Sequence, residues 1–261
     1  MVATLCRCLL AGLLAFAGFA PAFALTVPDG LEVEAPACLE DATGTATLAE
    51  VVARAGDFSP LPTDVADYRF SSSAYWFHLR VANRRDVPAT FYLDIRHATL
   101  DHLDLHVLRA DGRVETLATG DRVPSLAKPF PSATPALPFR LAAGESADLY
   151  LRAHTEGGSM LVPLAVSDQE GMERSLADER TWHGLLLGLY ALLFVFNVLV
   201  FLMFRERSSL YFAVFLPFAF LSSASLSGFV PTAFFADGTW MANEGLVFST
   251  GTAFLANLMF S

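Results

Sequence analysis

Two short segments of the sequence carry alternating aromatic and polar side chains that could bind a ligand. These side chains are Trp76, His78 and Arg80 in the first segment and Tyr92, Asp94 and Arg96 in the second. Residues spaced two apart project from the same face of a β-strand. An aromatic ring can stack on the apolar face of a sugar while charged groups bind its hydroxyls. If the two strands lie side by side, the six residues form a candidate ligand-binding face.

Trp76 also has a second interpretation, because most aromatic side chains in strands pack against other residues rather than against ligands. In that case Trp76 lies under a loop and the neighbouring charges are simply solvated. The variant Trp76→Ala separates the two interpretations. Weaker ligand binding by a folded domain would support the binding role, and an unfolded domain would support packing.

A metal site is the weaker expectation for His102, Asp104 and His106. Their spacing places all three on one strand face, which could present a metal ion. No fourth ligand follows at a fixed spacing, so the sequence predicts no metal and no cofactor. The sequence also contains no Gly-rich phosphate loop after a strand and no Gly-x-Ser-x-Gly motif. We therefore expect no enzymatic activity from this chain.

Alternation with period two dominates residues 25–167 and predicts the strands that would position these side chains. The alternating segments are Tyr75–Ala82, Phe91–Arg96, His102–Val107 and Asp148–Ala153. Turn residues separate them, at Asn83–Pro88, Ala110–Arg113 and Ala142–Glu145. One short helix is expected at Ala46–Ala55, and the proline-rich segment Pro124–Pro138 is expected to be a surface loop. This pattern predicts an antiparallel β-sandwich of the jelly-roll kind.

The N-terminus, residues 1–24, has the pattern of a secretory signal peptide. Arg7 is followed by a short apolar segment, Leu9–Ala20, and by the small-x-small sequence Ala22-Phe23-Ala24. We expect cleavage after Ala24, with an uncleaved anchor as the alternative. The cleaved chain would keep one cysteine, Cys38, and therefore no internal disulfide. A small buried residue is the expected role of Cys38.

The net charge of −10 limits the possible partners. Acidic residues outnumber basic ones, 24 to 14, between Leu25 and Thr181. This excess disfavours nucleic acid and anionic lipid surfaces as partners.

The C-terminal third predicts transmembrane helices. Residues 182–204 contain no charged side chain and are long enough to cross a bilayer. Two further apolar segments follow at 210–230 and 245–261, and the charged segment 168–181 is expected to lead into the first span as a helix. Arg205 and Arg207 lie between the first two spans, so the positive-inside rule places them in the cytoplasm and the N-terminal domain outside. The predicted location is a bacterial inner membrane, with residues 25–167 in the periplasm.

The sequence resembles the bacterial receptors with seven transmembrane helices and diverse intracellular signalling modules, the 7TMR-DISM family. The segment Tyr75–Asn83 is similar to a strand of the family's type-2 extracellular domain, and Asp101–Leu105 and the turn Asp111-Gly112 follow it. The segments Gly188–Tyr190 and Arg205–Tyr211, with Asn197 between them, are similar to the family's first span and first loop.

The resemblance implies a sensory receptor with a domain similar to carbohydrate-binding jelly rolls. Its helices would relay the signal to a cytoplasmic output module, which in relatives is often a diguanylate cyclase or a histidine kinase. Because residues 182–261 hold about three spans, we expect the chain to be a fragment that lacks this module. The expected partners are a small molecule or glycan and the membrane, and homodimerisation is left open. The alternative is a transporter or membrane-assembly component in which the sandwich is an interaction domain.

Overall fold

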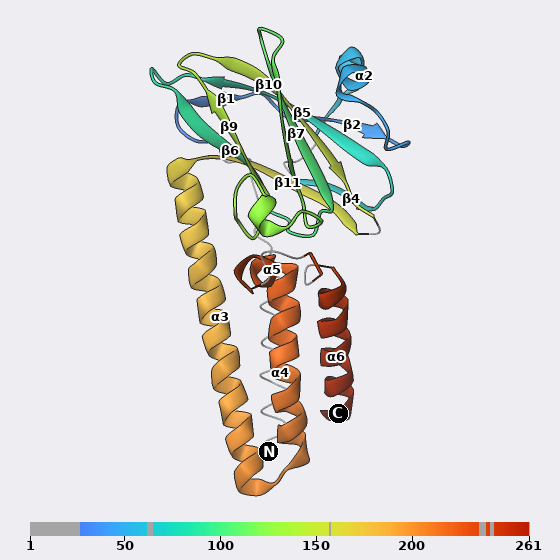
Figure 1. Ribbon diagram of the computed structural model, residues 1–261, viewed down its shortest axis with the longest axis vertical. Coiled ribbons are helices and arrows are strands. Elements are labelled where there is room, and N and C mark those ends of the chain that lie inside the picture. Colours follow the sequence, from blue (N-terminus) through green and yellow to red (C-terminus); the bar gives the residue numbers. More distant parts are fainter. Residues whose placement is uncertain (1–26, 62–64, 157, 235–238, 241–242, 261) are drawn as a thin grey trace.

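A β-sandwich lies at one end of the molecule and a group of helices extends away from it in the computed structural model (Figure 1). The structure describes residues 27–61, 65–156, 158–234, 239–240 and 243–260. The predicted signal peptide therefore lies outside the described residues.

Two antiparallel sheets form the sandwich. The seven-stranded sheet has the order β3-β2-β5-β10-β7-β8, with β1 also paired to β5, and the four-stranded sheet has the order β4-β11-β6-β9. The strands of the larger sheet are β1 (Leu31–Val33), β2 (Ala37–Asp41), β3 (Ser59–Pro60), β5 (Ala74–Asn83), β7 (His102–Arg109), β8 (Val114–Thr119) and β10 (Ser146–His154). Those of the smaller sheet are β4 (Val65–Phe70), β6 (Ala89–Ile95), β9 (Ala136–Leu141) and β11 (Ser159–Asp168). The predicted β-sandwich is confirmed.

The core lies between the two sheets and is built from alternate residues of each strand. Phe77 and Leu79 of β5 point inward, as do Phe91 and Leu93 of β6, and all four are fully buried. Since strand side chains alternate between faces, the residues between them face outward from their own sheet. Cys38 also belongs to this core, where burial raises the pKa of its thiol to about 11.

Two predicted segments differ from the structure. The expected helix at 46–55 is shorter, because α2 covers Leu48–Ala53, with Thr47 and Glu50 forming a capping box at its start. The proline-rich segment is a loop with a 3₁₀ turn at Ser125–Ala127, but it becomes strand β9 from Ala136 onward. Pro138 is tolerated there because β9 is an edge strand, where a missing N–H leaves no partner unpaired.

The helical part contains α3 (Gln169–Phe204), α4 (Arg207–Leu226), α5 (Phe229–Phe234) and α6 (Glu244–Phe260). Helix α3 is continuous through the charged segment and the first apolar segment, and it runs beside α4 (Figure 1). The expected second span, 210–230, is interrupted. Helix α4 ends at Leu226, and Gly228 has a φ of +77°, a left-handed conformation that separates α4 from α5.

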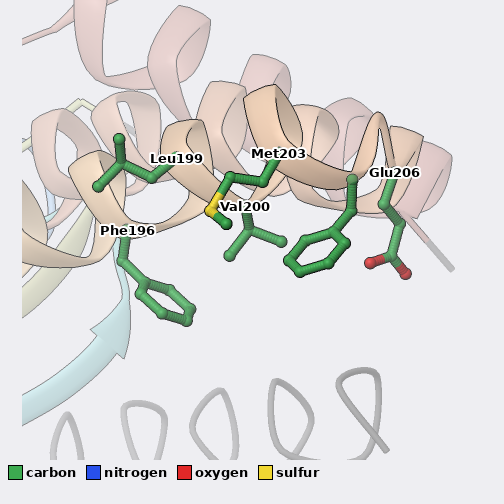
Figure 2. Close-up of a pocket in the computed structure, with 6 residues that line it drawn as sticks. Phe196, Leu199, Val200, Met203 and Glu206 are labelled. Atoms are coloured by element: carbon green, nitrogen blue, oxygen red, sulfur yellow. The ribbon is translucent and has the colours of Figure 1, made fainter.

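Among the described residues, α3 and α4 are the helices long and apolar enough to cross a membrane. Helix α6, with 17 residues, is about 25 Å long at 1.5 Å per residue, somewhat short of a full span. Much of the apolar surface of α3 is exposed. Figure 2 shows Phe196, Leu199, Val200 and Met203 of α3, with Glu206 just beyond its end. With Phe204 these residues line an apolar groove of about 830 Å³, the kind of surface that suits a lipid environment.

Candidate functional site

The outer face of the seven-stranded sheet gathers polar and aromatic side chains from three neighbouring strands. The strands lie in the order β5, β10 and β7, so alternate residues of each share this face. The face contains Trp76, His78 and Arg80 from β5, Asp148, Tyr150, Arg152 and His154 from β10, and His102, Asp104 and His106 from β7. We call this surface the outer sheet face.

Tyr150 is at the centre of the outer sheet face, because it lies opposite His78 on one side and His106 on the other. The rings of His78 and Tyr150 stack with centroids 4.6 Å apart. His78 Nε2 lies 2.9 Å from Asp148 Oδ1, and His106 Nδ1 lies 2.9 Å from Thr116 Oγ1. Burial lowers the pKa of His106, so near neutral pH its imidazole favours the uncharged form. These contacts hold the rings in place before any ligand binds.

Charged groups surround these rings. Arg152 donates to Asp104 Oδ2 at 3.3 Å and to the carbonyl oxygen of Gly44 at 2.8 Å. Arg80 is exposed and lies opposite Asp148 in the strand register. Within the part of the chain that the structure describes, the guanidinium of Arg80 forms no ion pair. Of the two arginines on the outer sheet face, Arg80 is therefore the more available to an incoming ligand.

Trp76 lies on this face of the sheet, but it is covered and not open to a ligand as predicted. Its side chain is 1% exposed and packs in a small cluster with Leu39, Val51 and Tyr150, beneath α2. Val51, on α2, is itself fully buried. The packing interpretation of Trp76 is therefore the correct one, because a helix that the sequence placed only approximately covers this end of the strand. The indole Nε1 is buried without a hydrogen-bond partner among the described residues.

Tyr92, Asp94 and Arg96 are not part of the outer sheet face. They lie on β6, which belongs to the four-stranded sheet, so the core separates them from His78 and Arg80. The prediction that the two sets join was wrong because β5 and β6, although consecutive, lie in opposite sheets. Asp94 is buried and paired with Arg96 at 3.1 Å, and burial raises the pKa of its carboxyl.

The strand beside β5 on this face is β10, with β7 on the far side of β10, and the sequence pattern predicted part of this face. His102, Asp104 and His106 share one face, as their spacing predicted, and Arg152 and Asp148 alternate in the same way. Pairing across 70 residues of sequence, as between His78 and Asp148, has no local signal. Among the described residues, no group of three or more His, Cys, Asp and Glu side chains is placed to hold a metal ion.

The junction between the sandwich and the helices forms a second polar region. A cleft of about 440 Å³ separates the lower end of the sandwich from the end of α4 and the start of α6, and we call it the junction cleft. Its sandwich side is lined by Thr99, Asp101, Asp121, Arg122, Thr155, Glu156 and Gly158, and its helix side by Leu226, Asn243, Glu244, Leu246 and Val247.

Beside this cleft, the loop that leads into β9 contacts the helices directly. A Cβ atom on Gly228 would lie 2.1 Å from the carbonyl oxygen of Ala133, so the two backbones touch. The next residue, Phe229, stacks on His183 of α3 at 4.4 Å, and His183 Nε2 lies 2.7 Å from Ser227 Oγ. The loop, the α4–α5 turn and α3 are thus packed together in one contact.

Comparison with known families agrees with this two-part architecture. Residues 35–168 match the family described as 7TMR-DISM extracellular 2, and residues 179–261 match the family described as 7TM diverse intracellular signalling. The first match alone covers more than half of the chain. The chain belongs to the 7TMR-DISM family. These domains identify a membrane receptor with an outward-facing N-terminal domain, as predicted from the resemblance.

Several solved structures show a distant likeness to part of this 7TMR-DISM chain. TmCBM61 in complex with β-1,4-galactotriose is 5% identical with a TM-score of 0.24, and the match covers 54% of this chain and 90% of that one. An exo-β-1,3-galactanase from Phanerochaete chrysosporium is 8% identical with a TM-score of 0.22, covering 39% and 25%. The chain therefore spans about a quarter of the galactanase. A tailspike protein of bacteriophage CBA120 is 8% identical with a TM-score of 0.25, covering 54% and 19%.

These likenesses are too distant to carry an argument about ligands. A search of curated proteins found no match.

Proposed function

We propose that the outer sheet face binds a small polar ligand, with carbohydrates as the leading class, and that the helices relay the bound state across a bacterial inner membrane. The observation that carries the proposal is the row of stacked rings flanked by Arg80, Arg152 and Asp104. Planar rings and fixed charges are the groups that recognise sugar rings and hydroxyls. Most of these groups are partly exposed, so a ligand can reach them.

Two contacts support the relay. Arg85, in the turn after β5, pairs with Asp168 at 2.8 Å, and Asp168 caps the start of α3 by accepting from Gly171 N–H. At the other contact, the loop carrying Ala133 packs on Gly228. Movement of the sandwich therefore reaches the helices through both α3 and the α4–α5 turn. A ligand shifts such a receptor only by binding one of its states more tightly than the other.

In this proposal the N-terminal domain is periplasmic and the chain itself is not a catalyst. The signal passes to a cytoplasmic output module. The excess of acidic residues favours a neutral or cationic ligand over nucleic acid.

Binding of the full chain, in detergent, to an oligosaccharide array tests the ligand class. For an oligosaccharide that binds, Arg80→Ala should weaken binding about 10- to 100-fold, because a hydrogen bond to a charged group contributes about 1.5–3 kcal/mol. Arg140→Ala is the matched control, because Arg140 is exposed on β9 of the opposite sheet.

Equal effects of the two variants would remove the outer sheet face from the proposal. Failure of the array to bind any oligosaccharide would remove carbohydrates as the ligand class.

A further inference from the structure

Two carboxyl groups meet at the sandwich side of the junction cleft. Both line the cleft, and the β7–β8 hairpin holds them side by side, because Leu103 pairs with Thr119 and Asp121 N–H donates to the carbonyl oxygen of Leu100 at 2.9 Å. Two adjacent carboxyl groups can share a hydrogen bond only when one of them is protonated. Asp101 is the fixed partner. It is 4% exposed, and its carboxylate accepts from Thr155 Oγ1 at 2.9 Å, from Glu156 N–H and from Arg122 Nε at 3.1 Å. Asp121 is the member of the pair that can gain or lose the proton.

The environment of the pair assigns the shared proton to Asp121. Burial raises the pKa of Asp101, but the hydrogen bonds that its carboxylate accepts outweigh burial and leave the pKa below its ordinary value. Burial, together with the nearby Asp101, raises the pKa of Asp121 to about 7. The second oxygen of Asp121, Oδ1, is buried without a partner among the described residues. An ionised Asp121 would therefore be poorly solvated as well as repelled by Asp101.

Charged groups from each side of the cleft face this pair. Arg122 and Lys128 belong to the same loop as Asp121, and Glu156 belongs to the turn between β10 and β11. Glu244, the first residue of α6, lies within electrostatic range of Arg122. With Asp121 neutral, Arg122 pairs with Asp101 and attracts Glu244, which draws α6 toward the sandwich. With Asp121 ionised, Arg122 is shared among the carboxylates of Asp101, Asp121 and Glu244. The adjacent carboxylates of Asp101 and Asp121 then repel each other.

Asp121 is also linked to the helices through its own loop. This loop runs from Gly120 to Pro135 and contains Ala133, the residue whose carbonyl oxygen touches Gly228. Because Asp101 is held by several hydrogen bonds, repulsion displaces the loop rather than Asp101. The same displacement loosens the contact with the α4–α5 turn.

We propose that the Asp101–Asp121 pair is a proton-sensitive contact between the sandwich and the helices: loss of the shared proton moves the loop 120–135 and opens the junction cleft toward α6. The receptor then responds to the pH of the compartment outside the membrane. This response does not depend on the ligand site proposed above.

Spin labels measure the opening directly. The full chain in lipid nanodiscs, with its cysteines at 6, 8 and 38 replaced, carries labels at Leu126→Cys in the loop and Leu255→Cys in α6, since both side chains are exposed. We expect the distance distribution to shift between pH 5.5 and pH 8.5, with a midpoint near 7. Asp121→Asn, which is neutral at every pH, should lose this shift and keep the low-pH distribution.

Glu179→Gln is the matched control. Glu179 is another partly buried carboxyl at this junction, on α3 near Asp94, so its replacement should leave the shift in place. Retention of the shift in Asp121→Asn overturns the proposal, as does loss of the shift in Glu179→Gln or a distance that does not change with pH. If Asp121→Asn fails to fold, the variant Glu244→Gln is measured in its place. Without the attraction between Arg122 and Glu244, the junction cleft should close less at low pH. No ligand is used, so either outcome leaves the binding test of Arg80 unaffected.

Discussion

At the scale of single residues, the surroundings of a side chain decide its role as much as its chemical type does. Trp76 has an aromatic ring that could stack on a sugar, but α2 covers this ring, and Leu39 and Val51 pack around it. Asn83 shows the same principle. It is fully buried, and its amide donates to the carbonyl oxygens of Val87 and Ala142, so it joins two turns at the end of the sandwich. In both cases the surroundings of the side chain give it a structural role.

Trp76→Ala should destabilise the sandwich. Truncating a fully buried Trp typically lowers the free energy of unfolding by about 3–5 kcal/mol, through lost burial and the remaining cavity. Chemical unfolding of the full chain, followed by near-ultraviolet circular dichroism, measures the loss. Phe70→Ala is the control, because Phe70 is 81% exposed and should cost little. A Trp76→Ala protein of normal stability that no longer bound its ligand would restore Trp76 to the binding site.

Asp121 should make stability depend on pH in a defined direction. Its pKa in the folded protein, about 7, lies above the ordinary value of 3.8, so the unfolded state releases its proton first. Its contribution to stability is therefore complete below about pH 4 and is lost as the pH rises to about 7. Melting temperatures measured from pH 4 to 8 should fall less for Asp121→Asn than for the unmodified chain. Parallel pH profiles would contradict the raised pKa.

At the scale of elements, α3 is the main connection between the two parts of the receptor. It has 36 residues and is about 54 Å long, with its first turns against the small sheet and the rest beside α4. Asp168 caps its start and Arg85 fixes that cap to the sandwich. A continuous helix transmits displacement better than a flexible tether, since its backbone hydrogen bonds resist bending.

Gly228→Ala should separate the loop from the helices. The new methyl group would lie 2.1 Å from the carbonyl oxygen of Ala133, and the φ of +77° disfavours any residue with a Cβ by about 1–2 kcal/mol. Hydrogen exchange of the loop 124–135 should become at least about tenfold faster, in line with that cost. Gly251→Ala is the control, because a Cβ there meets nothing within 4 Å. Unchanged exchange would show that this contact does not hold the loop.

At the scale of the whole molecule, charge and hydropathy set the orientation. The acidic sandwich lies at one end of the helices and the loop with Arg205 and Arg207 at the other (Figure 1). Helices α3 and α4 are long and apolar enough to span the bilayer between these ends. The positive-inside rule then places the sandwich outside the cytoplasm.

Reporter fusions test this orientation. Joined after Arg207, a reporter enzyme that works only in the cytoplasm should be active. Joined after Thr181, a reporter enzyme that works only after export should be active instead. Activity of an exported reporter after Arg207 would reverse the topology and with it the proposed direction of signalling.

The sequence determined the parts of this receptor that depend on local pattern. Strand alternation gave the inward residues of β5, β6, β7 and β10, and the uncharged segment after Thr181 gave the first membrane helix. The order of family motifs gave the receptor family. Each of these signals is contained within a few turns or strands, so no distant contact is needed to interpret it.

The tertiary structure alone decided which residues share a site. β5 pairs with β10, and β10 pairs with β7, whereas β6 belongs to the other sheet, so Arg80 faces Asp148 while Asp94 lies on the opposite sheet. Asp101 and Asp121, by contrast, lie at the open end of the β7–β8 hairpin, where Leu103 pairs with Thr119 and Asp121 N–H donates to the carbonyl oxygen of Leu100. Strand pairing is fixed by how the whole core packs, and that packing depends on contacts between segments far apart in the chain.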